Sequence, residues 1–132
     1  MLEPAYPPPP AQDRQRLANA RTELAQFQRK GEERARQLGL THVQHHLLLA
    51  VHTHPQDHPG VAMVADQLAL RRNSAAELVN RTVVAGYLRR APHDQDRRRG
   101  QLHLTRQAEQ DLNALCQPQL TDLADLIQAL AR

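Results

Sequence analysis

Aromatic side chains are almost absent from this chain of 132 residues, which contains Tyr6, Phe27, Tyr87 and no tryptophan. A hydrophobic core must therefore be built from leucine, valine and alanine, and this favours packed helices over a β-sandwich. A chain of this length has room for one core and not for two. We therefore expect a single, mainly helical domain.

Cysteine and long apolar runs are scarce as well. Cys116 is the one cysteine, so no disulfide can form within the chain, which fits a reducing cytoplasm. No apolar run approaches the length of a membrane span. The first residues hold Glu3 and a run of prolines, which is unlike a secretory signal. We expect a soluble, cytoplasmic protein with no membrane partner.

Positive charge is concentrated in one stretch, although the net charge of the chain is only +3. Residues 71–99 hold eight arginines and three acidic residues, which gives a net charge of +5. The rest of the chain has nine basic and eleven acidic residues, a net charge of −2. A basic stretch of this kind is typical of a surface that binds a polyanion, and the alternative is a solvated, arginine-rich face.

The first third of the chain predicts an arm followed by a long helix. Residues 1–11 hold five of the nine prolines and are expected to be disordered or extended. From Asp13 to about Leu38, apolar residues recur at helical spacing, and Gly31 within them predicts a kink or a close helix contact. The helix is too long to bury its apolar stripe within a small domain, so we expect it to pack against a partner subunit.

Three shorter helices are predicted in the middle of the chain. Thr41 is the expected N-cap of the first, which is followed by a loop over residues 52–60. The second covers residues 61–69. The third starts at residue 72 or 73 and ends before Gly86, because glycine is typical of the position just after a helix. Its predicted inward positions are Ala75, Leu78, Val79 and Val83.

A hairpin and a last helix follow. Residues 87–89 and 101–104 are predicted strands, separated by a polar turn over residues 92–100. Thr105 is the expected N-cap of the last helix, in which Pro118 predicts either a kink or a meeting of two helices. Two short helices joined by a tight turn and followed by a two-stranded hairpin form a winged helix-turn-helix.

The third short helix and the hairpin turn carry the candidate functional residues. A recognition helix must present short polar and basic side chains to the major groove of DNA, and arginine at a wing tip suits a narrow minor groove. The residues that meet these requirements, and that we predict to bind DNA, are Arg71, Arg72, Asn73, Ser74, Glu77, Arg81, Asp96, Arg97, Arg98 and Arg99.

The segment VAMVADQLALRRNSAAELVNRTVVAGYLRRAPHDQDRRRGQLHLT resembles the DNA-binding core of the MarR (multiple antibiotic resistance regulator) family. The family frame A-x-x-L-x-L…S-x-x-x-L-V-x-R…A-G-x-L-x-R starts here at Ala65 and ends at Arg90. Asp96 and Arg98 meet the wing signature of the family, and Leu104 and Thr105 follow it as expected. The resemblance extends to roughly residues 13–130.

The resemblance implies a mainly α (α+β) fold, namely a winged helix-turn-helix with long N- and C-terminal dimerisation helices. The chain would then consist of the arm, residues 1–11, and a single domain over residues 12–132. Within that domain, the DNA-binding winged helix-turn-helix would cover about 41–105. The dimerisation helices would cover about 12–38 and 106–131.

The same resemblance implies a homodimeric, sequence-specific transcription regulator without a cofactor. Family members are usually repressors that bind pseudo-palindromic operators in double-stranded DNA, and many release DNA when a small ligand, an oxidant or a metal binds. The resemblance places Ser74, Glu77 and Arg81 on the recognition helix. It places Arg98 near the minor groove, with Asp96 bracing it by an ion pair.

Two other functions compete with this interpretation. A winged helix can be a protein-interaction module, but such modules usually lose the basic residues that this chain keeps at the wing and recognition helix. An enzyme would need a nucleophile with its base, a glycine-rich phosphate loop or paired catalytic carboxylates, and the sequence predicts none of these. We therefore expect no catalytic residues.

Three local features call for separate expectations. The cluster of His42, His45 and His46 suits zinc in a metal-responsive regulator, but no set of cysteines or carboxylates completes it, so we assign no metal site. Cys116, next to apolar residues, is expected to be a buried filler rather than an oxidant sensor. Ala69 occupies a turn position where many members of the family have glycine, and a left-handed turn would strain it.

Overall fold

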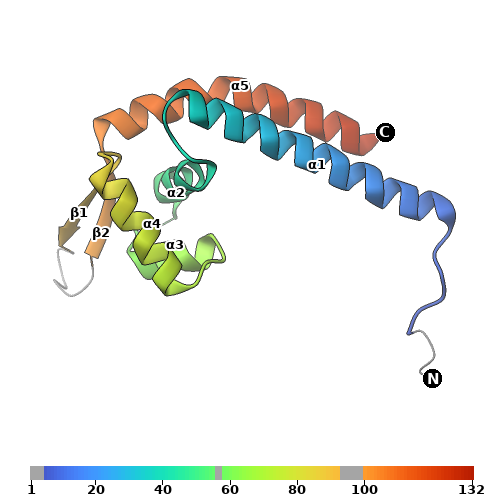
Figure 1. The fold of residues 1–132 in the computed structure, drawn as a ribbon, viewed down its shortest axis with the longest axis horizontal. Helices are drawn as coiled ribbons and strands as arrows, with labels where there is room; N and C mark the ends of the chain where they lie inside the picture. Colours follow the sequence, from blue (N-terminus) through green and yellow to red (C-terminus); the bar gives the residue numbers. More distant parts are fainter. Residues whose placement is uncertain (1–4, 56–57, 93–99) are drawn as a thin grey trace.

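The computed structural model describes residues 5–55, 58–92 and 100–132. In chain order the elements are α1 (Ala11–Gln37), α2 (His42–Thr53), α3 (Val61–Gln67), α4 (Arg72–Val84), β1 (Leu88–Pro92), β2 (Gly100–Leu104) and α5 (Arg106–Ala131). Figure 1 shows α1 and α5 side by side as a long helical pair, with the other elements gathered below one end of it. The mainly helical winged helix-turn-helix fold is confirmed. We refer to residues 38–105 as the head and to α1 with α5 as the helical pair.

Helix α1 begins directly after the proline run, so Ala11 belongs to the helix rather than to the arm. Asp13 lies in its first turn and Arg36 in its last, where each charge interacts favourably with the helix dipole. The helix passes through Gly31 without interruption. A Cβ added at Gly31 would lie 3.7 Å from the Nε2 atom of Gln119, so the expected helix contact is present and is made with α5.

The head closes its core with aliphatic side chains from every one of its elements. Leu47, Val64, Val79 and Leu102, which come from α2, α3, α4 and β2, are each at most 1% exposed. They belong to one cluster that also takes in Leu112 from α5. The base of the helical pair is therefore anchored in the core of the head.

The strands differ in extent from the prediction. Strand β1 begins at Leu88 and runs to Pro92, which had been assigned to the turn, and Pro92 pairs with Gly100 of β2. Proline is tolerated there because it is the last residue of an edge strand. Helix α2 likewise extends to Thr53, into the predicted loop.

Helix α5 runs without a break through Pro118, so the prediction of two helices meeting there is wrong. Proline removes only one backbone donor from the helix ladder, and the packing on both sides of it keeps the helix together. Before it, Leu112 and Leu115 pack into the head. After it, Arg34 of α1 holds Asp122 with two hydrogen bonds, Nε to Oδ2 at 2.7 Å and Nη2 to Oδ1 at 3.0 Å.

Cys116 is exposed, so its expected role as a buried apolar filler is wrong. Its neighbour Leu115 is buried, and each residue of an α-helix is rotated by about 100° from the one before it. This rotation carries the thiol out of the core.

Of the helices that the described residues form, none is long and apolar enough to cross a membrane.

Candidate nucleic-acid interface

The turn between α3 and α4 determines the direction of the second helix. The backbone N–H of Leu70 donates to the carbonyl of Ala65 at 2.9 Å, and that of Ala69 donates to Asp66 at 3.2 Å. Ala69 has a φ of 56°, in the left-handed region that favours glycine. The left-handed turn is therefore present, and it is also the reason why α3 ends at Gln67 rather than at residue 69.

One side of α4 is fixed in the core of the head. Ala75, Leu78, Val79 and Thr82 are each at most 2% exposed, and the first three were predicted core residues. The hydroxyl of Thr82 donates to the carbonyl of Leu78 at 2.7 Å, which satisfies its hydrogen-bonding capacity inside the core. This buried side sets the rotation of α4 and so determines which side chains face outward.

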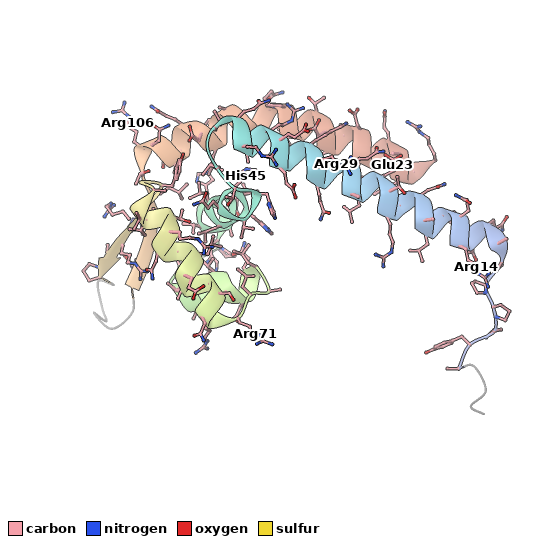
Figure 2. All side chains as sticks on the ribbon, in the orientation of Figure 1. Arg14, Glu23, Arg29, His45, Arg71 and Arg106 are labelled. Carbon is pink, nitrogen blue, oxygen red and sulfur yellow. The ribbon has the colours of Figure 1, made fainter. Side chains whose placement is uncertain are left out.

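The opposite side of α4 carries the predicted contact residues. All six of them that belong to this part of the chain are exposed: Arg71, Arg72, Asn73, Ser74, Glu77 and Arg81. Arg71 is the N-cap residue, and its side chain makes no capping hydrogen bond. Figure 2 shows Arg71 at the end of the head that lies farthest from the helical pair. An open helix start flanked by arginines is electrostatically suited to an anion such as a phosphate.

The base of the wing is tied to α4 and α5. Leu88 of β1 and Leu102 of β2 are buried, which anchors the hairpin to the core. The Thr105 hydroxyl donates to the carbonyl of Gly86 at 2.7 Å and so joins the start of α5 to the end of α4. Thr105 also accepts from the backbone N–H of Ala108, as an N-cap should.

A side-chain contact that the sequence did not predict connects the wing with α4. Arg90 of β1 donates through Nη2 to the Oδ1 atom of Asn80 on α4. Arg90 had counted only as part of the family frame, because a strand residue gives no sequence signal for its partner on another element. The contact holds the exposed face of α4 and the first wing strand in one arrangement.

The predicted wing tip, which comprises Asp96, Arg97, Arg98 and Arg99, lies outside the described residues and stays a prediction. In the chain these residues connect β1 to β2. The described residues 71–92 include five exposed arginines (71, 72, 81, 89 and 90) and only one acidic residue, Glu77. The basic stretch of the sequence is therefore a basic surface in this part of the head.

A hollow of about 450 Å³ lies where α1, α2 and α5 meet, and the three clustered histidines line it. His45 Nδ1 lies 3.5 Å from Gln119 Nε2, and His42 Nδ1 lies 3.8 Å from Glu32 Oε1. Burial, and to a smaller extent the charge of His46, lowers the pKa of His45. Across residues 5–55, 58–92 and 100–132, no three His, Cys, Asp or Glu side chains are grouped so that they could hold a metal ion.

Comparison with known proteins finds similarity to one family over the head and to solved structures over most of the chain. Residues 38–99 match the MarR family. The structure is similar to AbsC, a MarR family transcriptional regulator from Streptomyces coelicolor, with a TM-score of 0.78 at 14% identity over 95% of this chain and 84% of AbsC. It is similar to the transcription regulator MarR from Oenococcus oeni, with a TM-score of 0.70 at 16% identity over 80% and 79% of the two chains.

A third similar structure is the DNA complex of MepR from Staphylococcus aureus, with a TM-score of 0.67 at 21% identity over 84% of this chain and 78% of MepR. No match was found among curated proteins. The family match covers residues 38–99 of the head, and the match to AbsC extends over the helical pair. Residues 38–99 therefore match the MarR family, and the chain has the fold of the MarR family structures to which it is similar.

Proposed function

We propose that this protein is a homodimeric, sequence-specific DNA-binding transcription regulator that acts as a repressor and is released by a small ligand. The proposal depends mainly on the two different sides of α4. Its apolar side is held in the core by Ala75, Leu78 and Val79, while its other side presents exposed polar and basic residues. The MepR structure with bound DNA supports the same use of this fold here.

In this proposal α4 enters the major groove of double-stranded DNA. Asn73, Ser74, Glu77 and Arg81 contact base edges, because side chains of these types have the donors and acceptors that distinguish base pairs. Arg71 and Arg72 neutralise phosphates at the start of the helix. The wing residues Arg97, Arg98 and Arg99 reach the adjacent minor groove, and Asp96 orients Arg98.

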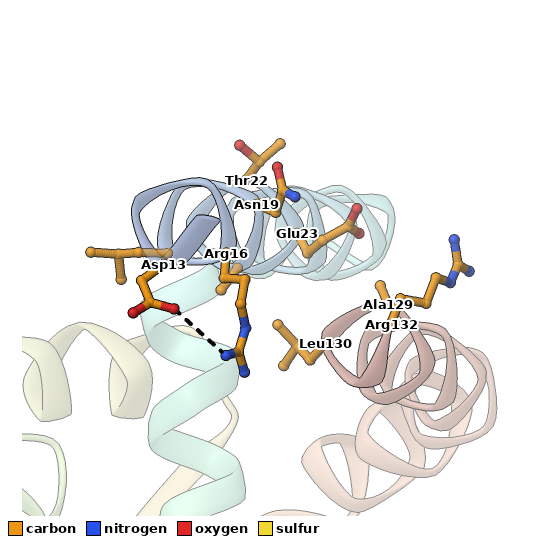
Figure 3. A pocket seen from close by; sticks show the side chains of 10 residues that line it. Asp13, Arg16, Asn19, Thr22, Glu23, Ala129, Leu130 and Arg132 are labelled. Atoms are coloured by element: carbon orange, nitrogen blue, oxygen red, sulfur yellow. Dashed lines mark ion pairs between the residues drawn. The ribbon is translucent and has the colours of Figure 1, made fainter. Parts of the chain in front are cut away.

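A second copy of the chain completes the helical pair. Its outer apolar side chains are largely exposed in the single chain: Leu17 60%, Leu24 46%, Leu123 39%, Ile127 58% and Leu130 50%. A groove of about 530 Å³ lies between the start of α1 and the end of α5. Figure 3 shows Arg16 and Leu130 among the side chains that line it. Pairing two copies along these surfaces gives two heads, one for each half of a pseudo-palindromic operator.

The effector is assigned to the hollow between the helical pair and the head. His45 and Gln119 meet across it from α2 and α5, so a ligand that separates them alters how the head sits on the helical pair. The lining combines imidazole, amide and carboxylate groups with Phe27 and Leu49, which suits a small organic molecule with both polar and apolar parts.

A salt-dependent gel shift on the DNA upstream of its own gene tests DNA binding. Specific binding should weaken steeply with salt, because each phosphate contact releases counterions. Arg98→Ala should weaken binding to all sequences and reduce the slope of log affinity against log salt by about 1. Arg81→Ala should also change the discrimination between operator variants.

Arg106→Ala is the matched control, since Arg106 is an exposed arginine at the start of α5, above the head, whereas Arg71 lies at the side of the head farthest from the helical pair (Figure 2). It should leave the salt slope unchanged. A folded protein that binds no specific DNA would overturn the proposal and favour the protein-interaction module. An Arg98→Ala variant that binds like the wild type would remove the wing from the interface.

A further inference from the structure

A second group of histidines lies at the base of the wing, away from the hollow assigned to the effector. His52, His54, His58 and His103 line a surface hollow of about 220 Å³. His52 belongs to the end of α2, His54 and His58 to the connection between α2 and α3, and His103 to strand β2. Half of the eight histidines of the chain therefore meet where the helix-turn-helix adjoins the wing.

Two of these rings are in direct contact. The ring centroids of His58 and His103 are 3.7 Å apart, and the ring planes form an angle of 30°. Next to His58, the carbonyl of Pro59 accepts a hydrogen bond from the backbone N–H of Leu102 at 2.9 Å. The stacked rings thus reinforce a backbone contact between the α2–α3 connection and the second wing strand.

The backbone of His58 is held in an uncommon conformation at this contact. Its φ is 61°, in the left-handed region that non-glycine residues rarely adopt. Such a conformation persists only where the surrounding structure maintains it, and here the stacked rings and the backbone hydrogen bond at Pro59 both join this connection to β2. Weakening the ring contact therefore removes one of the interactions that keep this connection against β2.

The charged groups around the pair are mainly cationic or able to become so. Arg89 of β1 stands directly across the ladder from His103, and His52 and His54 line the same hollow. Glu109 of α5 is the one carboxylate among the described residues that line it. Val51, Leu102 and Leu104 complete the lining with apolar surface.

We propose that the stacked pair of His58 and His103 is a proton-sensitive contact that couples the α2–α3 connection to the wing and weakens DNA binding in acid. This inference rests on the proposed function and adds a regulation to it. Imidazole is the side chain type that gains a positive charge between neutral pH and mild acid. A first positive charge on the pair is offset by the carboxylate of Glu109, which lines the same hollow.

The second proton gives two cations in stacking contact beside Arg89, and their repulsion is relieved only when the rings separate. Separation frees the α2–α3 connection from β2 and loosens the wing. The sign of this effect is diagnostic. Acidification makes the whole protein more positive, which by itself strengthens attraction to DNA. A loss of specific binding in acid therefore cannot come from overall charge.

The test is the affinity for the upstream DNA fragment at pH 7.5 and pH 5.5 at constant ionic strength, measured for the wild type and three variants. His58→Asn removes the titrating ring and keeps a residue that tolerates the left-handed backbone. His103→Gln removes the other ring. His52→Gln is the matched control, because His52 lines the same hollow but is not part of the stacked pair.

The wild type and His52→Gln should lose about tenfold in affinity between the two pH values, a size typical of coupling between sites. His58→Asn and His103→Gln should lose less than about twofold. Circular dichroism at pH 5.5 confirms that each protein is folded. The inference is overturned when the wild type shows no loss, or when His58→Asn loses as much as the wild type.

A ring titration followed by NMR decides the contact without DNA. The two rings of the wild type should titrate in two separated steps, and His103 in His58→Asn should titrate in one. Coincident, independent titrations in the wild type would overturn the coupling. Absence of specific DNA binding at pH 7.5 would instead remove the proposed function, and the ring titration would still decide whether the pair senses protons.

Discussion

The head and the helical pair differ in how far their apolar side chains are exposed to solvent. Leu47 and Val79 of the head are fully buried within one chain, whereas Leu17 and Ile127 of the helical pair are 60% and 58% exposed. Both regions have a regular apolar pattern in the sequence. The difference indicates that the head buries its core within a single chain, and it supports our proposal that the helical pair packs against a second copy.

The largest expected effect comes from charging the open face of the helical pair. Ile127→Glu places a carboxylate in the proposed dimer contact, so the dimer should dissociate and the molar mass measured by light scattering should halve. Affinity for the upstream DNA should fall by about 100-fold, because two linked heads no longer bind together.

Val84→Glu is the matched control for that experiment. Val84 is 88% exposed, but it lies on the head at the end of α4, so the variant should keep the mass of the wild type. A double variant with Ile127→Glu and Leu123→Glu tests the proposal further. If it still has the mass of a dimer, the exposed face of the helical pair is not the dimer contact.

A smaller effect distinguishes the two kinds of leucine. Leu47→Ala in the head should lower the free energy of unfolding by about 3 kcal/mol, because it leaves a cavity in a closed core. This loss should be the same at all protein concentrations. Leu24→Ala in the helical pair should lower stability by an amount that depends on concentration, since its contacts are made with the second copy.

Urea unfolding at two protein concentrations, tenfold or more apart, measures both variants. A concentration-independent effect of Leu24→Ala would mean that Leu24 acts within its own chain. A negligible effect of Leu47→Ala would contradict the placement of this side chain in the core of the head.

The ion pair between Arg34 of α1 and Asp122 of α5, which we call the clamp, is expected to stabilise the helical pair by an amount that depends on pH. The hydrogen bonds from Arg34 are the main cause of the lowered pKa of Asp122, whose ordinary value is 3.8. The stability that this carboxylate contributes is therefore present above pH 3.8 and is lost as the pH falls through its lowered pKa. Asp122→Asn should lower the melting temperature by about 5 °C at pH 7, and the difference should vanish in acid.

Asp125→Asn is the matched control, because Asp125 lies on the exposed side of the same helix. Its melting curve should follow that of the wild type at every pH. If Asp122→Asn melts like the wild type at neutral pH, the clamp does not stabilise the helical pair.

How far the sequence predicted this structure depends on how local each signal is. Thr41, Thr105 and Gly86 mark helix boundaries through contacts with residues close by in the chain, and each does so as predicted. The core positions of α4 followed from helical spacing. The candidate face of α4 was therefore predictable, because burying one side of a helix exposes the other.

The failures involve contacts between distant segments. Pro118 does not break α5, because packing on the head and on α1 outweighs the loss of one hydrogen bond. The contact of Arg90 with Asn80 and the stacking of His58 on His103 join separate elements and leave no periodic trace in the sequence. Such contacts depend on the tertiary arrangement, and sequence patterns carry little information about it.

The smallest expected effect lies in the head, at the left-handed residue of the helix-turn-helix. Ala69 has a φ of 56°, where a Cβ costs about 1 kcal/mol, whereas glycine adopts the same backbone freely. Glycine also makes the unfolded chain more flexible, which offsets part of that gain. Ala69→Gly should therefore raise the free energy of urea unfolding by about 0.5 kcal/mol.

Ala62→Gly on α3 makes the same chemical change in a helix, where glycine costs about 1 kcal/mol, and it should lower stability. The opposite signs of the two variants separate backbone strain from the loss of a methyl group. A lower stability for Ala69→Gly would mean that this methyl contributes more to packing than the left-handed backbone costs. The side chain of Ala69 would then stabilise the turn, and the core of the head would include this residue, which sets the direction of α4.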